Sequence, residues 1–320
     1  MLSCAAAKEK GNVMKLELYI RGGLGNQLYQ YAAARYIQEK YGYDELIINS
    51  YDYRRYKIRN FEIENFELNS SVNITDKISR TKNILRSGYR VYQKLYSMIR
   101  KKRANTLFFN FNKWKYLLGI TEFMCPEMSQ KDVSDMFMYG YFVSSRPALE
   151  MKNKLMNEIK LSGERTERYK QLLNEVQSGK SIAVSIRCGS DYEKYDWPIC
   201  SKEFYLSGLE KIKEEIGECN VFIFADDVQK VKNGEWFGDN VTYVEGLDVC
   251  ESFELMRNCN NYVCSNSSFS WWGAFLSYSD TPIIYSSNRV FRKTGSEDDD
   301  RIRLTYVNYL DYLTGENVKS

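Results

Sequence analysis

The sequence predicts an α/β protein built from two Rossmann-like domains, each with a parallel sheet covered by helices on both faces. Two observations lead to this prediction. The chain has 320 residues, and since a typical domain has about 150, two domains are expected. In both halves of the chain, short apolar segments typical of buried strands alternate with longer segments of helical periodicity, a pattern that produces parallel sheets.

The N-terminal half opens with a strand, a glycine turn and a helix. Residues 16–20 alternate between apolar and other side chains, three glycines follow within 22–25, and helical periodicity runs over 26–40. The contiguous apolar residues within 44–49 indicate the next buried parallel strand. We therefore expect an N-terminal Rossmann-like domain over residues 14–150.

The same alternation recurs in the C-terminal half, for which we expect a second Rossmann-like domain over residues 151–320. The predicted strands are 182–186, 221–224, 241–244, 262–264 and 282–285, and the predicted helices are 201–216, 248–259 and 267–277. The mostly polar, helical segment 150–180 joins the two domains.

The composition excludes several classes of catalytic and metal-binding site. A net charge of +3 gives no global indication of a nucleic-acid partner. The chain contains no histidine, which excludes Ser-His-Asp and Cys-His catalysis and His-ligated metal sites. Its eight cysteines form no C-x-x-C pair, so we expect reduced thiols and a cytoplasmic location.

Residues 77–103 contain ten basic residues and no acid, interleaved with apolar residues at helical spacing. This pattern predicts a basic amphipathic helix that either contacts the anionic inner face of a membrane or receives a charged lipid-linked acceptor. A solvated surface helix is the alternative. No apolar run approaches the roughly 20 residues that span a bilayer, so we expect a soluble or peripheral protein. Residues 1–13 show no cleavable signal pattern.

The segment 263–274, VCSNSSFSWWGA, reads as a buried strand followed by a helix start. Asn266, Ser267 and Ser268 supply small polar groups at that start. A helix N-terminus binds anions through its unpaired N–H groups and its dipole, so a diphosphate is a fitting ligand. An ordinary Ser or Asn cap is the alternative interpretation.

A second polar group follows the strand in VSIRCGSDY, residues 184–192. Arg187 comes just after the strand, at the edge of a parallel sheet where ligands bind, and offers a permanent positive charge for a diphosphate oxygen. Asp191, with Glu193 and Asp196 close behind, offers a carboxylate that could accept a proton. A structural salt bridge between the arginine and an acid is the alternative.

The glycine turn GGLGNQ at 22–27 differs from a dinucleotide fingerprint, because it lacks the G-x-G-x-x-G spacing. Gly23 and Gly25 would still let a diphosphate or sugar approach the backbone, and Asn26 could hydrogen-bond to either. The same spacing disfavours a nicotinamide-dependent dehydrogenase.

Four motifs in order resemble those of the α-1,2-fucosyltransferases, glycosyltransferase family 11: GGLGNQLYQYAAA at 22–34, VSIRCGSDY at 184–192, FIFADD at 222–227 and SNSSFSWWGA at 265–274. The resemblance implies a GT-B-like fold, in which two Rossmann-like domains face each other across a cleft. It also implies GDP-fucose as donor, inversion at the anomeric carbon, no cofactor and no required metal. The implied acceptor is a terminal galactose on a glycan or lipid-linked oligosaccharide.

The resemblance also assigns roles to residues. Arg187 should bind the donor phosphates, and Asn26 should face the donor sugar or acceptor. The residues expected to line or lie near the nucleotide pocket are Gly23, Gly25, Asp226, Asp227, Asn266, Ser267, Ser268 and Phe269.

One departure concerns the family pattern H-x-R-R-G-D-Y, where this chain has Ser185 for the histidine, Cys188 for the second arginine and Ser190 inserted before Asp191. The base is therefore assigned to Asp191, with Glu193 as substitute.

The expected activity is that of a galactoside 2-α-L-fucosyltransferase. Three alternatives remain open: a fucosyltransferase of other linkage, a non-catalytic glycan or nucleotide binder of the same fold, and a metal-dependent transferase using the D-x-D pattern at 298–300. The basic residues that follow this last pattern favour a solvated loop instead.

Overall fold

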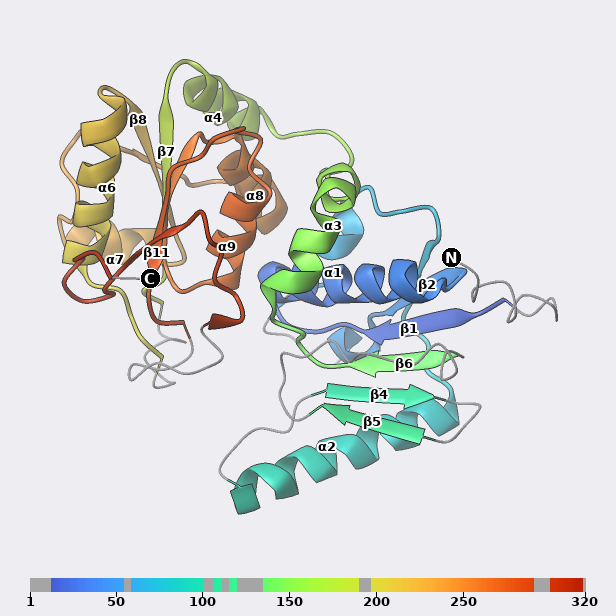
Figure 1. Cartoon of the computed structure of the whole chain (residues 1–320). Coiled ribbons are helices and arrows are strands. Elements are labelled where there is room, and N and C mark those ends of the chain that lie inside the picture. The colour runs from blue at the N-terminus through green and yellow to red at the C-terminus, as the bar shows by residue number, and fades with distance from the viewer. Residues whose placement is uncertain are drawn as a thin grey trace. The chain divides into compact units, whose positions relative to one another are not determined.

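The computed structural model describes residues 13–54, 59–100, 106–110, 115–119, 135–189, 197–290 and 300–318. The chain divides into two units, residues 1–159 and 160–320, each with its own six-stranded sheet (Figure 1). The sequence analysis placed this division after residue 150. Helix α3 (Ser145–Glu158) packs against α1 (Leu24–Tyr41), so it belongs to the N-terminal unit.

The N-terminal sheet has the order β3-β2-β1-β6-β4-β5. Its parallel strands are β1 (Lys15–Tyr19), β2 (Glu45–Asn49), β3 (Val72–Thr75) and β6 (Met136–Tyr139). The antiparallel strands β4 (Thr106–Asn110) and β5 (Lys115–Gly119) extend the sheet beyond β6. The sequence analysis did not predict this antiparallel extension.

Helices cover both faces of the N-terminal sheet, with α1 and α3 on one face and α2 (Arg80–Arg100) on the other (Figure 1). On the α2 face, Tyr19, Phe137 and Tyr139 form an aromatic cluster. Two ion pairs join α2 to the rest of the unit, Lys82 with Glu17 and Arg86 with Asp52. The basic segment predicted as a helix therefore covers one face of this sheet.

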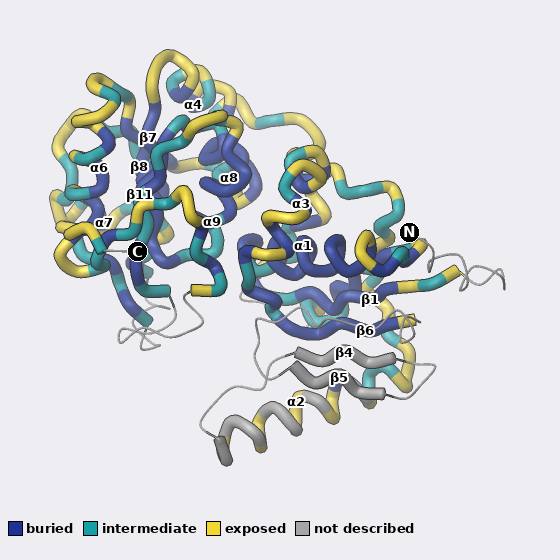
Figure 2. Tube along the Cα trace, viewed as in Figure 1, coloured by how far each residue is buried: buried dark blue, intermediate teal, exposed yellow. Residues whose placement is uncertain are grey.

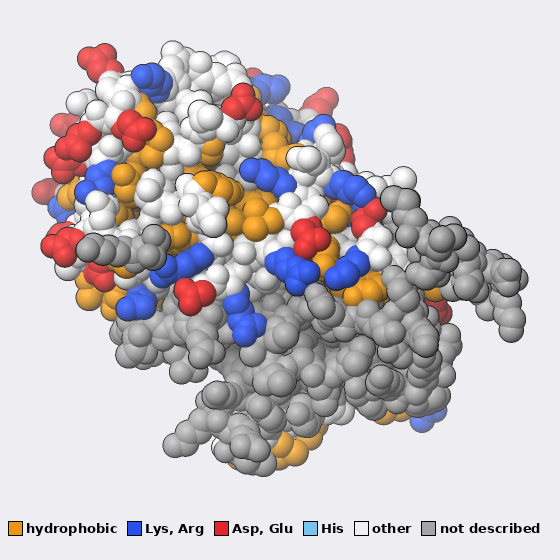
Figure 3. All heavy atoms as spheres, viewed as in Figure 1, with side chains coloured by type: hydrophobic (Ala, Val, Ile, Leu, Met, Phe, Trp, Pro, Cys, Tyr) orange, Lys and Arg blue, Asp and Glu red, His pale blue; other side chains and the backbone are white. Residues whose placement is uncertain are grey.

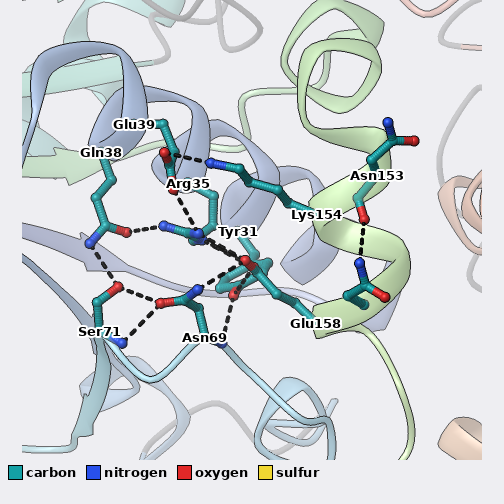
Figure 4. Close-up of polar contacts among 10 residues, drawn as sticks. Tyr31, Arg35, Gln38, Glu39, Asn69, Ser71, Asn153, Lys154 and Glu158 are labelled. Atoms are coloured by element: carbon teal, nitrogen blue, oxygen red, sulfur yellow. Dashed lines mark hydrogen bonds and ion pairs between the residues drawn. The ribbon is translucent and has the colours of Figure 1, made fainter.

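A buried polar cluster joins α3 to α1 (Figure 4). Nη2 of Arg35 lies 2.8 Å from Oε1 of Glu158, and both side chains are buried. The hydroxyl of Tyr31 donates to the same carboxylate at 2.6 Å, and Lys154 pairs with Glu39 at the exposed end of the cluster. Moving α3 away from α1 would separate Arg35 from Glu158 and leave a buried charge without its partner, which is costly. The pair therefore favours the observed position of α3.

The C-terminal sheet is entirely parallel, in the order β12-β11-β10-β7-β8-β9. Its strands are β7 (Ser181–Ile186), β8 (Asn220–Ala225), β9 (Thr242–Tyr243), β10 (Asn261–Cys264), β11 (Ile284–Ser287) and β12 (Asn308–Leu310). Numbered within the unit this is the order 3-2-1-4-5-6 of doubly wound nucleotide-binding sheets. The five strands predicted here are confirmed, with β11 beginning two residues later.

Two hydrophobic cores lie on the two faces of this sheet. One face packs against α4 (Glu167–Gln177), α8 (Val249–Asn258) and α9 (Ser268–Phe275), and the other against α6 (Lys202–Ile216) and α7 (Val228–Asn233). The central strands are accordingly buried along their lengths (Figure 2). Such burial on both faces explains why their sequences read as short continuous apolar runs.

The surface carries both signs of charge. On the face drawn in Figure 3, acidic and basic side chains are interspersed, in keeping with the net charge of +3. Among the described residues, no helix is both long enough and apolar enough to cross a membrane.

Candidate active site

Most of the predicted site residues lie at the carboxyl edge of the C-terminal sheet. Arg187 follows β7, Asp226 and Asp227 follow β8, and the segment 266–269 follows β10. Strands β7 and β10 are neighbours at the point where the strand order reverses. In open parallel sheets this switch point is where ligands bind.

A carboxylate holds Arg187 in place. Nη1 of Arg187 lies 3.2 Å from Oδ2 of Asp226. Oδ1 of Asp226 also accepts hydrogen bonds from the backbone N–H groups of Cys188 at 2.9 Å and Gly189 at 3.1 Å. The salt-bridge alternative is thus realised with Asp226, which follows the neighbouring strand β8. The ion pair with Asp226 orients the Arg187 side chain, which remains 24% exposed to solvent.

The neighbouring Asp227 caps a helix. Its side chain accepts from the backbone N–H of Lys230 at 3.0 Å, at the start of α7. Nζ of Lys230 in turn donates to the carbonyl oxygen of Cys188 at 3.0 Å. Asp226 therefore braces the loop after β7, and Asp227 caps the helix whose Lys230 also contacts that loop.

Serine hydroxyl groups fix the start of α9 beside the end of β7. Ser267 is the N-cap, and its side chain accepts from the backbone N–H of Phe269 at 3.2 Å. Oγ of Ser270 lies 2.6 Å from Oγ of Ser185 in β7 and 3.2 Å from Oγ of Ser265. The capping interpretation is confirmed, and it places the positive end of the helix dipole close to the loop that carries Arg187.

Two residues predicted to line the nucleotide pocket, Asn266 and Phe269, make contacts within the protein. Asn266 is buried, and its Nδ2 donates to the carbonyl oxygens of Pro198 at 2.5 Å and Val290 at 3.4 Å. Phe269 packs edge-on against Phe253 with ring centroids 5.6 Å apart. Asn266 therefore joins separate chain segments, and Phe269 contributes to the core beneath α9, while Ser267 and Ser268 are only partly buried.

The tryptophan pair is structural. Trp272 is fully buried. Trp271 donates from Nε1 to the carbonyl oxygen of Ile302 at 2.9 Å and stacks on Phe275 with ring centroids 4.7 Å apart. These side chains anchor α9 and so keep its N-terminus in position.

In the N-terminal unit, the glycine turn leads directly into α1. Gly22 has φ +89°, and a Cβ there would lie 3.0 Å from Nδ2 of Asn26, so both conformation and space favour glycine. Gly23 is the N-cap of α1, while Gly25 lies in its buried first turn. The Asn26 side chain is only partly buried, and its backbone N–H donates to the carbonyl oxygen of Gly23.

Two glutamines that the sequence analysis did not select hold this turn. Nε2 of Gln27 donates to the carbonyl oxygen of Gly22 at 2.9 Å, and Oε1 accepts from the backbone N–H groups of 62–63. Gln30 accepts from the backbone N–H of Arg21 at 3.0 Å and donates to its carbonyl oxygen at 2.7 Å. The glutamines of the GGLGNQ motif region thus act on the backbone.

A pocket of about 250 Å³ lies at the carboxyl edge of the N-terminal sheet, next to this turn. The described residues that line it are Arg21, Gly22, Tyr51, Asp52, Arg86, Arg90, Tyr139 and Tyr141. The sequence analysis missed Arg21. A signal was present, because Ile-Arg-x-Gly occurs at the end of the first strand of both units, at 20–23 and at 186–189.

Some predicted residues lie outside the described part of the chain, namely Asp191, Glu193, Asp298 and Asp299. The third aspartate of the D-x-D pattern, Asp300, is exposed and lies 3.3 Å from Nε of Arg303. Within the described residues, no cluster of three or more His, Cys, Asp or Glu side chains could hold a metal ion.

Cys188 follows Arg187 in the chain, and its thiol donates a weak hydrogen bond to the carbonyl oxygen of Asp227 at 3.7 Å. Burial, and after it the charge of Asp226, raises the pKa of Cys188 to about 11. The six cysteines of the described residues are free thiols, as the sequence predicted for them. Because the thiol stays neutral at physiological pH, Cys188 does not replace a charged arginine electrostatically.

Comparison with known proteins identifies the family of this chain. The chain matches Glycosyl transferase family 11 over residues 15–308. It is 28% identical over 296 residues to an α-1,2-colitosyltransferase of Escherichia coli, covering 86% of this chain and 91% of the relative. It is 26% identical over 299 residues to the O-antigen biosynthesis glycosyltransferase WbnK of Escherichia coli, covering 85% and 93%.

Among solved structures, the fucosyltransferase NodZ from Bradyrhizobium is similar with a TM-score of 0.50 and 16% identity, covering 83% of this chain and 94% of that chain. This likeness concerns the fold, and it agrees with the α/β, GT-B-like class of two Rossmann-like domains predicted from the sequence. From its match over most of its length, the chain belongs to glycosyltransferase family 11 and is a glycosyltransferase.

Proposed function

We propose that this enzyme is an inverting galactoside 2-α-L-fucosyltransferase, which transfers L-fucose from GDP-fucose to the 2-hydroxyl of a terminal galactose. Family membership supports the donor class, and the name of the α-1,2-colitosyltransferase relative supports the linkage. The acceptor class, a galactose-terminated glycan or lipid-linked oligosaccharide, is supported by the name of the O-antigen relative.

One observation carries the donor assignment: Arg187 and the N-terminus of α9 follow neighbouring strands at the switch point of the C-terminal sheet. The diphosphate gains negative charge as the bond to the sugar breaks. A fixed guanidinium and a helix N-terminus supply positive charge for it without a metal ion. Ser267 and Ser268 present the first N–H groups of α9, while Asp226 keeps Arg187 in place.

The proposed reaction is a single displacement. The oxygen of the galactose 2-hydroxyl attacks C1 of fucose while the bond from C1 to the GDP oxygen breaks, and GDP leaves with the electron pair. The hydroxyl proton passes to a carboxylate, for which we propose Asp191 with Glu193 as substitute. Asn26 and the backbone at Gly23 and Gly25 contribute to sugar binding from the N-terminal domain, the proposed acceptor side.

A second donor deserves a direct test, because one relative carries the name of a colitosyltransferase. Colitose is the 3-deoxy analogue of fucose, so GDP-colitose would place the same diphosphate on the same groups. The two donors differ only by a hydroxyl. An enzyme whose polar groups hydrogen-bond this hydroxyl would reject GDP-colitose strongly. An enzyme with a hydrophobic pocket at that position would reject GDP-fucose only weakly.

The function is tested by mixing the enzyme with GDP-fucose or GDP-colitose and a series of galactosides, and by analysing the product linkage by NMR. We expect an α-1,2 product and GDP release only when a galactoside is present, with full activity in EDTA. Asp191→Asn should abolish transfer but keep GDP binding, and Glu193→Gln is its matched comparison. The absence of any transfer across the series would favour the non-catalytic alternative.

We also propose a cytoplasmic enzyme that contacts an anionic membrane surface through α2. Four apolar side chains repeat along the exposed side of α2 at spacings of seven, four and three residues, each more than half exposed: Ile84, Val91, Leu95 and Met98. The helix contains no acid, and Arg80 and Lys94 are exposed near these residues. An apolar stripe beside basic residues suits an anionic lipid surface.

This contact is tested by sedimentation with vesicles of phosphatidylglycerol and phosphatidylcholine. The double variant Val91→Ser and Leu95→Ser should lose binding to anionic vesicles, whereas Leu149→Ser, which changes an exposed leucine of α3, should keep it. Equal sedimentation of all three proteins would exclude the proposed contact.

A further inference from the structure

The N-terminal sheet has a switch point of its own, and the pocket of about 250 Å³ lies there. Strand β1 lies between β2 and β6, so the order of the parallel strands reverses at β1. Each of the three strands leads into the pocket: Gly22 follows β1, Tyr51 and Asp52 follow β2, and Tyr141 follows β6. Ligands of open parallel sheets bind at such points. Since the groups proposed for the diphosphate belong to the other unit, this pocket suits the acceptor.

Two donors hold the carboxylate of Asp52 in the wall of the pocket. Its Oδ1 pairs with Nη1 of Arg86, whose side chain is buried, and its Oδ2 accepts from the hydroxyl of Tyr139 at 3.4 Å. Among the described residues these are its hydrogen-bonding partners. A carboxylate offers about four lone-pair positions, and the Asp52 side chain is still 16% exposed. It can therefore accept further hydrogen bonds from the hydroxyl groups of a ligand.

Tyrosine rings lie in the same wall. Tyr51 directly precedes Asp52, and its ring centroid lies 5.1 Å from the guanidinium carbon of Arg86. The ring centroid of Tyr141 lies 4.3 Å from the guanidinium carbon of Arg21. Both tyrosines are only partly buried, and both line the pocket. Aromatic surface beside a polar group that accepts hydrogen bonds suits a sugar, which has apolar C–H faces and a rim of hydroxyl groups.

We propose that this pocket binds the sugar to which the terminal galactose of the acceptor is attached. Asp52 accepts hydrogen bonds from hydroxyl groups of that sugar, and Tyr51 and Tyr141 pack on its ring. The inference rests on the proposed function, because it extends the acceptor site at Asn26. Gly22 belongs both to the pocket lining and to the GGLGNQ turn, so a glycan whose last sugar lies at the turn can place the next sugar in the pocket. A volume of about 250 Å³ is below the roughly 300–1,000 Å³ of pockets for drug-sized ligands and suits one sugar ring.

Acceptors of one and two sugars test this proposal. Methyl β-galactoside provides the terminal galactose alone, whereas the methyl glycosides of lactose and of galactosyl-β-1,3-N-acetylglucosamine add the sugar that enters the pocket. We expect at least one disaccharide to show a KM about tenfold below that of methyl β-galactoside with a similar kcat, because it gains a charge-assisted hydrogen bond and a ring contact. Equal KM values for all three acceptors overturn the proposal.

Variants locate the effect. Asp52→Asn and Tyr51→Ala should each bring the ratio of the two KM values close to one, whereas Tyr51→Phe, which keeps the ring, should retain the wild-type ratio. Asp76→Asn is the control, because Asp76 is an exposed aspartate that also pairs with an arginine, Arg54, and neither is among the described lining residues. Since Asp52 is the partner of the buried Arg86, circular dichroism must show that each variant is folded. Survival of the preference in folded Asp52→Asn or Tyr51→Ala, or its equal loss in Asp76→Asn, overturns the assignment.

Binding without donor separates this inference from the proposed function. Saturation-transfer NMR reports which ring of a disaccharide contacts the protein even if no sugar is transferred. If no acceptor is used, the proposed function fails, but contact with the second ring that Asp52→Asn abolishes would still support the pocket. If galactosides are used and the second ring receives no saturation, the proposed function stands and the inference fails.

Discussion

Two arginines occupy the same position in the two units and contact different side chains. Arg21 follows β1 and Arg187 follows β7, the first strand of each sheet. Arg187 lies against the carboxylate of Asp226, whereas Arg21 lies between the rings of Tyr139 and Tyr141. The same residue type at the same point of the fold is thus oriented by a charge in one unit and by aromatic rings in the other.

This difference has an electrostatic consequence. A carboxylate partner offsets the charge of Arg187 before any ligand arrives, so the helix N-terminus of α9 must supply part of the positive potential for a diphosphate. The rings beside Arg21 instead present their negative faces to its guanidinium group, which favours one orientation of that group. We therefore expect Arg187 to matter most when charge develops during the reaction, and Arg21 to matter less for that step.

The largest effect is expected for Arg187→Ala. Removing one fixed donor from a developing anion typically costs about 2.7–4 kcal/mol, so kcat/KM should fall by about 10²–10³-fold. Arg187→Lys should recover only part of this loss, because lysine keeps the charge but lacks the planar fork. Steady-state kinetics with GDP-fucose and a galactoside measure both values.

Arg21→Ala is the matched comparison in the other unit. It should leave the affinity for GDP, measured by calorimetry, close to that of the unchanged enzyme, whereas Arg187→Ala should weaken it. Near-normal turnover of folded Arg187→Ala, or an equal loss of GDP affinity in both variants, would contradict the division of roles between the two arginines.

The sequence was sufficient to predict the C-terminal fold but less of the N-terminal one. Strands buried on both faces, such as β7 and β10, carry apolar runs that identify them directly. The antiparallel pair β4 and β5 extends the N-terminal sheet by pairing with β6, a contact between residues far apart in the chain that no local pattern reports. The sequence analysis assigned most of helix α3 to the linking segment. Its residue Glu158 pairs with Arg35, which lies 123 residues away in the chain, and no local pattern reports such a contact.

The same distinction between local patterns and contacts over long sequence separations explains which site residues the sequence analysis selected. Arg187 and Ser267 stood out because a strand end and a helix start are visible in local sequence. Arg21 owes its orientation to Tyr139, 118 residues away, and Asp226 binds backbone groups of a different strand's loop. Such partners depend on the order of strands in the sheet, which the local pattern does not contain.

A smaller effect, on stability, is expected for Gln30→Leu, which tests how the turn beneath Arg21 is held. The substitution removes the hydrogen bonds that Gln30 makes to the backbone N–H and carbonyl oxygen of Arg21. Because buried polar groups without partners cost about 1–3 kcal/mol, the free energy of unfolding from urea titration should fall by about this amount. Hydrogen exchange at the Arg21 amide should accelerate.

The control is Gln171→Leu, an exposed position of α4, which should change stability by less than about 0.5 kcal/mol. If Gln30→Leu unfolds at the same urea concentration as this control, the turn is held by the glycine conformation and by Gln27 rather than by Gln30.

The smallest effect concerns Cys188, whose thiol reports on how well Asp226 offsets Arg187. Burial, followed by the charge of Asp226, raises the pKa of Cys188 to about 11. At pH 9 the thiol should therefore react with iodoacetamide about 50- to 100-fold more slowly than an unfolded cysteine, whose pKa is about 8.5. Since the folded pKa is the higher one, the neutral thiol's contribution to stability is complete below pH 8.5 and is lost as pH rises through about 11.

Asp226→Asn removes a negative charge beside this thiol and leaves Arg187 without its carboxylate. The pKa of Cys188 should then fall, so its alkylation at pH 9, followed by mass spectrometry of the Cys188 peptide, should accelerate. Cys259, which is fully buried and whose pKa is also raised by burial, should react at an unchanged rate and so control for local unfolding. An unchanged rate at Cys188 would mean that burial alone sets its pKa, and that Asp226 positions the Arg187 loop without offsetting its charge.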